Sequence, residues 1–288
     1  MNPVIQLNNL IKRHGAHTVV DIDELQIQPG KIVGLIGPNG AGKTSALRCI
    51  LGLASYEGEL SVLGKNPYRQ RPELMREVAF IADTAVLPRW ITAGQLLDYM
   101  AGIHPSFNRK KAEGFLAATN IRAGARVRTL SKGMITQLHL ALIVAIEAKL
   151  LLLDEPTLGL DIIYRQRFYE QLLNDYYDES RTIIITTHQV EEVEQILTDL
   201  LFIKDGKLVL NCTLDEIPER FFEVNVEAEQ VEEARRLNPI FERVVFGSHI
   251  MMFEGGEQTD LANLGSVRTP NIANLFVAKL GDGKMEVV

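Results

Sequence analysis

Three short runs of the chain are apolar at nearly every position instead of alternating with polar residues. They read "KIVGLIG" (31–37), "KLLLLDE" (149–155) and "RTIIITTH" (181–188). A strand that is apolar at every position is covered on both faces, which is typical of a parallel sheet flanked by helices. The pattern therefore predicts an α/β fold built on a parallel sheet.

The segments that follow these runs extend the prediction. After the first run, a glycine-rich turn leads into "KTSALRCILGL", a helical pattern that ends near Gly52, which suits a helix C-cap. Further on, "LLFIKDGKLVL" places Asp205-Gly206 between two apolar runs, the pattern of a tight hairpin. The core is expected to finish around residue 210.

Two regions show other patterns. Between residues 84 and 147 the segments "TAGQLLDYMAGI", "RKKAEGFLAAT" and "KGMITQLHLALIVAIEA" have helical periodicity, with no strand among them, and predict a helical insertion. Beyond Cys212, "FFEVNVEAEQVEEARRL" and "ERVVFGSHIMMFEG" indicate a strand, a helix and a strand pair that turns near Gly247-Ser248. We expect a small α+β appendage over residues 212–288.

Composition narrows the class of protein. In 288 residues, the hydrophobic share of 46% and the charged share of 23% are ordinary for a globular protein. The mid-chain apolar run 138–146 is well short of the roughly 18 residues that span a bilayer, and the N-terminus lacks the apolar core of a secretory signal. We therefore expect a cytoplasmic protein whose two distant cysteines, Cys49 and Cys212, are reduced. The net charge of −7 disfavours nucleic acid as a partner.

The strongest chemical signal is "GPNGAGKT" at 37–44, which fits the phosphate-loop pattern G-x-x-x-x-G-K-[ST] between a predicted strand and helix. Glycines let the backbone N–H groups converge on a phosphate at the positive end of the helix. Lys43 should bridge the β- and γ-phosphates, and the Thr44 hydroxyl should bind Mg²⁺. The predicted nucleotide-binding residues here are Gly37, Asn39, Gly40, Ala41, Gly42, Lys43, Thr44 and Ser45.

Two further strand ends carry candidate catalytic groups. Asp154 ends an apolar strand, where an aspartate can hold the Mg²⁺ shell. Glu155 follows, and adjacent strand residues point to opposite faces, so Glu155 is expected to polarise a water beside the γ-phosphate. A helix cap or an ion pair is the alternative for Glu155. His188, after "TIIITT", is expected to contact the γ-phosphate, although a lone histidine is more commonly a plain surface or core residue.

The ordered set of motifs resembles the ATP-binding subunits of ABC transporters. The motifs are "GPNGAGKT", "LSKGM" (130–134), "LLLLDEPT", "GLD" (159–161) and "TTH" (186–188), and the resemblance covers residues 1 to about 215. It implies an ABC-type ATP-binding domain over residues 1–211, with a P-loop NTPase core, an N-terminal antiparallel β part and the helical insertion at about 84–147. It also implies ATP and Mg²⁺ as cofactors.

In that family, "LSKGM" occupies the signature position, usually LSGGQ, and the nucleotide lies between two subunits that face head to tail. The resemblance therefore implies that Ser131 and Gly133 bind the γ-phosphate held by the phosphate loop of a second chain. Lys132 and Met134 replace the usual glycine and glutamine.

Two more positions depart from the family. The usual metal-contacting glutamine falls at Asp83, whose carboxylate can reach a metal through water but cannot donate a hydrogen bond. The aromatic residue that stacks on adenine falls at His14, which is either a smaller stacking face or an ordinary surface histidine.

The resemblance implies a cytoplasmic ATPase that dimerises on ATP, as a homodimer or heterodimer, and drives a separate transmembrane permease from the inner face of the membrane. "HPSFNRKKAE" and "LSKGM" are similar to the subfamily serving bacterial exporters of drugs, peptides or lipid-like compounds. Arg89 and Trp90 fall where such subunits meet their permease, although Trp90 could equally pack within the insertion. The alternatives are a soluble ABC-type ATPase acting on ribosomes or nucleic acid, and a regulatory ATP sensor.

Overall fold

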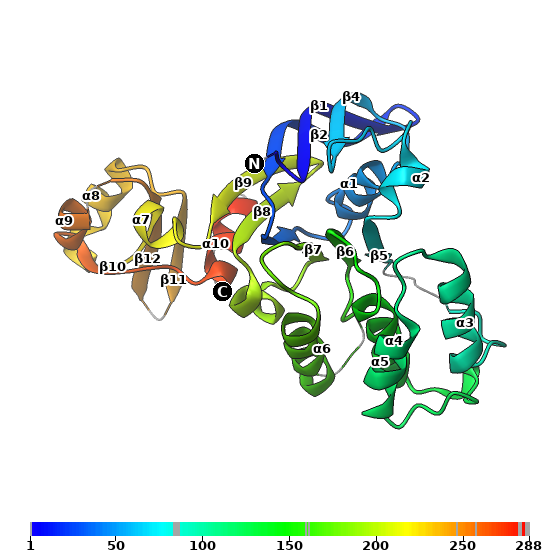
Figure 1. Ribbon diagram of the computed structural model, residues 1–288. Helices are drawn as coiled ribbons and strands as arrows, with labels where there is room; N and C mark the ends of the chain where they lie inside the picture. Colours follow the sequence, from blue (N-terminus) through cyan, green and yellow to red (C-terminus); the bar gives the residue numbers. More distant parts are fainter. Residues whose placement is uncertain are drawn as a thin grey trace.

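A six-stranded sheet forms the centre of the molecule (Figure 1). The computed structural model describes residues 2–82, 87–158, 160, 162–245, 247–256, 258–281 and 284–285. The strand order is β5-β6-β7-β3-β8-β9, in which β9 alone runs antiparallel to its neighbour. The strands are β3 (Ile32–Ile36), β5 (Val78–Ile81), β6 (Leu150–Asp154), β7 (Thr182–Thr187), β8 (Asp199–Lys204) and β9 (Lys207–Thr213).

The three continuous apolar runs of the sequence are neighbouring strands of this sheet. They form β6, β7 and β3 in adjacent positions, and every residue of these strands is buried. Their side chains alternate between two apolar clusters, one on each face, so no position could be polar without a partner. The predicted parallel sheet is confirmed. The predicted hairpin is confirmed too, because Asp205 and Gly206 join β8 to β9 with φ of 49° and 81°.

A second, antiparallel sheet covers one face of the first (Figure 1). Its order is β2-β1-β4, and helix α1 lies between it and the central sheet, in the same apolar cluster. The predicted helix end is correct, since Gly52 follows α1 with φ of 63°. These elements are β1 (Ile5–His14), β2 (His17–Ile27), β4 (Glu57–Val62), α1 (Lys43–Ile50) and the short α2 (Arg71–Leu74).

The helical insertion lies beyond β5 and returns to the sheet at β6. Its helices begin at polar caps that the sequence supplies: Thr92 with Gln95 as a capping box, Asn108, and Ser131. Among the described residues between 87 and 147 no strand forms, as predicted, and only isolated bridges occur. The elements are α3 (Ala93–Ile103), α4 (Arg109–Ala117), the 3-10 turn η1 (Val127–Thr129) and α5 (Lys132–Val144), and after β6 comes α6 (Ile162–Asp175).

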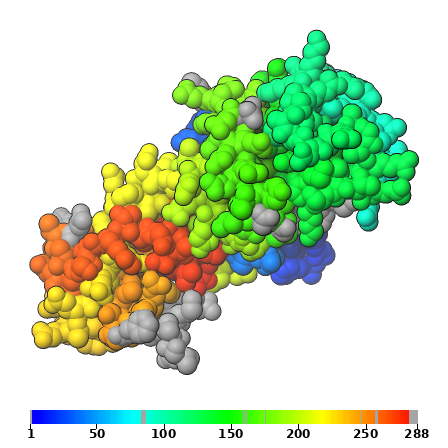
Figure 2. Space-filling model, turned by 90° about the horizontal axis from the view of Figure 1, so that it is seen from below, coloured from blue at the N-terminus to red at the C-terminus, as the bar shows by residue number. Residues whose placement is uncertain are grey.

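The appendage forms a lobe at the opposite end from the helical insertion (Figure 2). The predicted order of strand, helix and strand pair is present as β10, α8, β11 and β12, with Gly247 at the turn. Its elements are α7 (Ile217–Arg220), β10 (Phe221–Val226), η4 (Ala228–Gln230), α8 (Val231–Arg236), β11 (Phe241–Val245), β12 (Ser248–Glu254), α9 (Gln258–Ala262), β13 (Gly265–Arg268), α10 (Ile272–Leu280) and β14 (Lys284–Met285). Two 3-10 turns, η2 (Val190–Glu192) and η3 (Glu194–Ile196), belong to the core and connect β7 to β8.

The last helix of the appendage packs back onto the central sheet. Ile272 and Leu275 of α10 belong to the apolar cluster that includes Phe202 of β8, and Phe276 meets Phe202 edge to face at 5.3 Å. Lys204 donates to the Leu280 carbonyl at 2.8 Å. The apolar core therefore continues past residue 210, where the sequence pattern had it finish, and the division at residue 212 stays a prediction.

Truncating Phe202 should loosen this junction. Phe202 is fully buried between the sheet and α10, so Phe202→Ala is expected to lower the free energy of unfolding by about 3–5 kcal/mol. Leu237→Ala removes an exposed apolar side chain from the appendage and should change it by less than about 0.5 kcal/mol. Chemical denaturation of both variants checks this, and equal midpoints for the two would contradict the assigned packing.

Candidate functional site

Three neighbouring strands end at one edge of the sheet and bring the predicted site together. The register pairs Ile36 of β3 with Thr187 of β7, and Thr186 of β7 with Asp154 of β6. The Gly37 N–H also donates to the Thr187 carbonyl at 3.2 Å. The phosphate loop, His188 and Glu155 therefore leave the sheet side by side, at the carboxyl ends of parallel strands, where ligands of such sheets bind.

The phosphate loop has glycines where the backbone admits no side chain. A Cβ atom at Gly37 would lie 2.4 Å from the Ile203 carbonyl oxygen, and one at Gly42 would lie 2.4 Å from that of Val19. Gly42 also has φ of 107°, a left-handed conformation that favours glycine. Tertiary contacts from β8 and β2 thus fix the loop from two sides.

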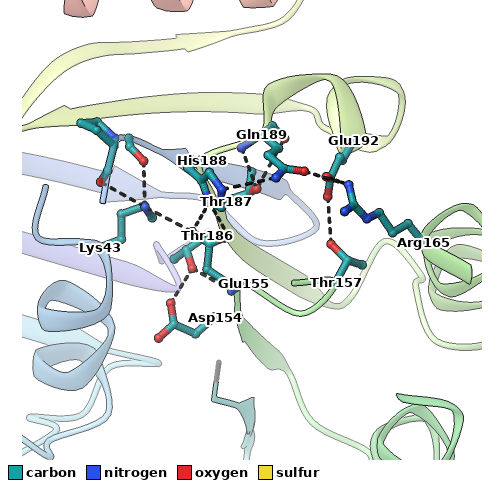
Figure 3. Close-up of polar contacts among 12 residues, drawn as sticks. Lys43, Asp154, Glu155, Thr157, Arg165, Thr186, Thr187, His188, Gln189 and Glu192 are labelled. Atoms are coloured by element: carbon teal, nitrogen blue, oxygen red, sulfur yellow. Dashed lines mark hydrogen bonds and ion pairs between the residues drawn. The ribbon is translucent and has the colours of Figure 1, made fainter. Parts of the chain in front are cut away.

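The end of the phosphate loop, where α1 begins, is suited to binding an anion. Among the described residues, no side chain caps the N-terminus of α1, whose N-cap is Gly42. Lys43 is 6% exposed, and its ammonium group donates to the carbonyls of Gly37 at 2.7 Å and Pro38 at 3.2 Å (Figure 3). Ala41 is buried, Asn39 and Gly40 are exposed, and Thr44 and Ser45 are partly exposed. Free helix N–H groups beside a buried cation form a phosphate-binding environment.

Asp154 is fixed at the end of β6. Its side chain is buried, and its Oδ1 accepts a hydrogen bond from the Thr186 hydroxyl at 2.6 Å. The Thr186 hydroxyl oxygen in turn accepts the Glu155 N–H at 3.2 Å. The threonine therefore fixes both acidic residues relative to β7.

Glu155 lies outside the strand, in a left-handed conformation with φ of 47°. The expected divergence from Asp154 therefore comes from a turn of the backbone and not from strand alternation. Its carboxylate is 12% exposed and lies between two cationic or donor groups: Lys43 Nζ at 3.2 Å, and His188 Nδ1 at 3.0 and 3.1 Å (Figure 3). Strained backbone of this kind clusters at functional sites.

His188 follows β7, as the sequence predicted. Its Nδ1 faces the Glu155 carboxylate, and its Nε2 lies 3.3 Å from Nε2 of Gln189. These partners are side chains of the same chain, and the predicted contact with a γ-phosphate stays a prediction.

A polar network beside this site was missed by the sequence analysis. Arg165 of α6 forms an ion pair with Glu192 of η2 and donates to the Gln189 amide oxygen at 2.8 Å. The Thr157 hydroxyl lies 3.0 Å from Glu192 Oε2 and 3.2 Å from the Tyr169 hydroxyl, whose pKa is raised by burial. No local motif marks these residues, because they come from three separate segments.

The predicted signature residues lie at the start of α5. Ser131 is exposed and its hydroxyl accepts the Met134 N–H at 3.3 Å, so it caps its own helix. Gly133 is buried under the ring of Tyr164 in α6, where an added Cβ would lie 3.2 Å from two ring carbons. In the described structure, Ser131 therefore contacts its own helix α5, and Gly133 contacts α6 of the same chain.

The remaining predicted residues divide into two groups. His14 is exposed in the β1–β2 hairpin, opposite His17, and β2 continues to Val19, which contacts Gly42. Asp83, and Gly159 and Asp161 of "GLD", lie outside the described residues.

A cleft of about 180 Å³ opens beside Glu155, between α5 and the segment after β6. Its lining includes Lys132, Ile135 and His139 of α5. Burial lowers the pKa of His139 to about 4, so its imidazole is neutral at physiological pH, and its Nε2 has no hydrogen-bond partner among the described residues. Lys132, which replaces the usual glycine of the signature motif, therefore lines the same cleft as the candidate catalytic residue Glu155.

Comparisons with known proteins identify the family of the chain. A family model described as "ABC transporter" matches residues 20–158. The chain is 31% identical over 265 residues to Nod factor export ATP-binding protein I of Cupriavidus metallidurans, covering 88% of this chain and 86% of the relative. It is also 31% identical over 223 residues to bacitracin transport ATP-binding protein BcrA of Enterococcus faecalis, covering 76% of this chain and 72% of the relative.

A solved structure of an ABC transporter subunit has a similar fold. The "Structure of ATP binding subunit of ABC transporter" has a TM-score of 0.64 and 25% identity, covering 74% of this chain and 91% of that one. The fold and the site define a P-loop nucleotide-binding protein. The names of the relatives narrow this class to one family. The chain belongs to the ATP-binding subunits of ABC transporters, and like them it is an ATPase.

The helices give one finding about membranes. Within the described ranges, every helix is too short or too polar to cross a bilayer.

Proposed function

We propose that this chain hydrolyses ATP for a separate membrane permease that exports its cargo. The observation that carries the proposal is the position of Glu155, a strained, nearly buried carboxylate between Lys43 of the phosphate loop and His188. Export is supported by relatives whose names specify export of Nod factor and transport of bacitracin. Relatives of this kind disfavour the alternative of a soluble ATPase acting on ribosomes or nucleic acid.

The phosphates of ATP would lie against the loop from Gly37 to Ser45, with Lys43 as the cation and His14 beside the base. Backbone N–H groups at the start of α1 would donate to the β-phosphate. A γ-phosphate at Lys43 would compete with the Lys43–Glu155 ion pair, because one ammonium group has only three donors and two are already directed to carbonyls. Nucleotide binding would therefore release Glu155 for catalysis.

The donor set fits Mg²⁺. Within the described part of the chain, only Oδ1 of Asp154 accepts a hydrogen bond, and the Thr44 hydroxyl lies at the start of α1. Among the described residues no three His, Cys, Asp or Glu side chains gather into a metal cluster, but Mg²⁺ requires only one or two carboxylates with phosphate oxygens and waters. Thr44, Asp154 and, through water, Asp83 would hold it, and it would neutralise charge on the phosphates.

In the hydrolytic step, Glu155 would accept a proton from water that attacks the γ-phosphate, and His188 would orient the Glu155 carboxylate. The cleft beside Glu155 would provide the space that the attacking water needs near this carboxylate. Lys43 remains at the phosphates, where its charge stabilises the transition state.

Two chains are needed for a complete site in this proposal. Ser131 is exposed and the N-terminus of α5 is polar, which supports a role for Ser131 and Gly133 on the γ-phosphate of a second subunit. The partner chain could be identical or different. Residues 1–211 would form the ATPase unit and residues 212–288 an accessory unit.

Ser131→Arg should spare ATP binding by the isolated monomer and abolish closure of the pair, because a bulky cation replaces a small donor at the junction. ATPase activity and nucleotide affinity are measured on the same preparations. Asn108→Arg removes a cap of the same kind from the neighbouring helix α4 and serves as the control for lost capping.

Mixing tests the trans arrangement directly. A heterodimer of Ser131→Arg and Lys43→Ala chains retains one intact composite site, formed by Lys43 of the first chain and Ser131 of the second. Some hydrolysis should return on mixing if one site suffices. Lost nucleotide affinity in monomeric Ser131→Arg would place Ser131 in its own chain's pocket and contradict the trans assignment.

The permease is expected to dock near the start of the helical insertion. Trp90 is 73% exposed, so packing within the insertion does not account for it, and Tyr99 and Ile103 of α3 are exposed as well. Purifying the chain with its membrane partner and reconstituting both in vesicles tests the export proposal. ATP-driven release of cargo from the ATP-containing side supports it, whereas ATP-driven uptake toward that side contradicts it.

A further inference from the structure

Gln189 links Arg165 to His188 through the two ends of its side-chain amide (Figure 3). Arg165 Nη1 donates to Gln189 Oε1 at 2.8 Å, and a guanidinium group has only donors. The amide oxygen must therefore face Arg165. The amide NH₂ group is then the end that lies 3.3 Å from His188 Nε2.

These partners fix which nitrogen of His188 carries the proton. An amide NH₂ group can only donate, so His188 Nε2 must accept, and a neutral imidazole then carries its proton on Nδ1. Nδ1 faces the two oxygens of the Glu155 carboxylate at 3.1 and 3.0 Å, where an N–H is the matching donor. The opposite tautomer would place donor against donor at Gln189 and lone pair against carboxylate at Glu155.

We propose that Arg165 and Gln189 are positioning residues for hydrolysis, which hold His188 as the Nδ1–H tautomer directed at Glu155. They act through His188 and do not touch the nucleotide. The proposal rests on the role of Glu155 as the general base.

Arg165 is itself held from several sides, which gives Gln189 a fixed partner. Its Nε donates to the Leu160 carbonyl at 2.8 Å, in the segment that follows Glu155, and its guanidinium pairs with Glu192 of η2. Glu192 also accepts from Thr157 at 3.0 Å. A planar fork can serve these partners together, whereas a lysine ammonium on a flexible stem cannot reproduce the geometry.

The segment that carries Gln189 and Glu192 is anchored from its other side by the appendage. Val190 of η2 is buried in the same apolar cluster as Ile272 and Leu275 of α10. The orientation of Gln189 is therefore fixed by polar contacts toward α6 and by packing toward α10.

Substitutions at Gln189 separate the effect of its amide hydrogen-bond donor from the effect of its side-chain size. Gln189→Glu keeps the shape and an acceptor for Arg165 but offers His188 Nε2 only an acceptor, while Glu155 still faces Nδ1. His188 should therefore carry a proton on Nε2 as well as on Nδ1 in this variant. Gln189→Leu removes both hydrogen bonds and should leave a mixture of tautomers. Gln166→Glu makes the same chemical change at the exposed residue next to Arg165 and is the matched control.

The direct test is nitrogen NMR of histidine-labelled, nucleotide-free protein at pH 8, where ¹⁵N shifts distinguish the two tautomers. His188→Gln assigns the His188 signals among the six histidines. The expected result is Nδ1–H in the parent and in Gln166→Glu, and protonated Nε2 in Gln189→Glu. An Nε2–H tautomer in the parent overturns the proposal.

The same variants are assayed for ATP turnover and ATP binding. Gln189→Glu and Arg165→Lys should lower kcat by roughly tenfold to a hundredfold, with the Kd for ATP within about twofold of the parent. Protonation of His188 Nε2 in Gln189→Glu without a fall in kcat, or a fall in kcat without protonation of Nε2 in that variant, overturns the positioning role. Glu155→Gln is included because parental turnover in that variant would refute the general base while leaving the tautomer assignment intact.

Discussion

Glu155→Gln should bind ATP normally and hydrolyse it about 10²–10⁴ times more slowly than the parent, because an amide of the same shape cannot accept the proton of the attacking water. The substitution also removes the ion pair between this residue and Lys43. Since the γ-phosphate would compete with that ion pair, ATP affinity should stay equal or rise. A stable ATP-bound pair of subunits should accumulate.

Single-turnover hydrolysis and equilibrium binding of ATP measure the rate and the affinity. Size-exclusion chromatography in the presence of ATP detects the stable pair of subunits. Glu147→Gln makes the same change at an exposed glutamate after α5 and should leave turnover unchanged. If Glu155→Gln hydrolysed ATP at the parental rate, Glu155 would not be the base, and its place between Lys43 and His188 would be that of a structural ion pair.

Lys43→Ala should weaken ATP binding itself, and nearly all ATP turnover should be lost as a result. Lys43 is the buried cation of the phosphate loop, and the phosphates would be in contact with it before as well as during the reaction. Hydrogen bonds to charged groups contribute about 1.5–3 kcal/mol, which corresponds to roughly a tenfold to hundredfold higher Kd.

Equilibrium binding of ATP with Mg²⁺ measures this effect, and thermal unfolding of the nucleotide-free variant verifies that the loop still folds without a donor to the Gly37 and Pro38 carbonyls. Lys207→Ala, at an exposed lysine in β9, is the control. An unchanged Kd in a folded Lys43→Ala protein would remove Lys43 from the phosphate site.

Much of the core could be predicted because its signals are local. The runs that became β3, β6 and β7 are buried on both faces, and burial on both faces demands apolar residues at successive positions. The loop glycines and Asp205-Gly206 reflect backbone conformations that few other residues adopt. The resemblance carried by the ordered motifs extended these local signals to the family.

The site required tertiary information at several particular residues. Glu155 and Asp154 diverge through a left-handed turn that strand alternation does not describe. Trp90 could be assigned to the surface only from its exposure, and the apolar core was found to pass the predicted boundary only because α10 folds back onto Phe202.

By itself, the sequence determined the parallel sheet, the phosphate loop and the acidic and histidine positions at the strand ends, because short-range steric and burial requirements dictate residue types at fixed spacing. Only the tertiary structure decided that Arg165, Gln189 and Glu192 support His188. Arg165 and Glu192 are 27 residues apart on different elements, and their contact depends on how α6 packs beside η2. Side-chain pairing at such a distance leaves no periodic trace in one sequence, since it is set by the packing of whole elements.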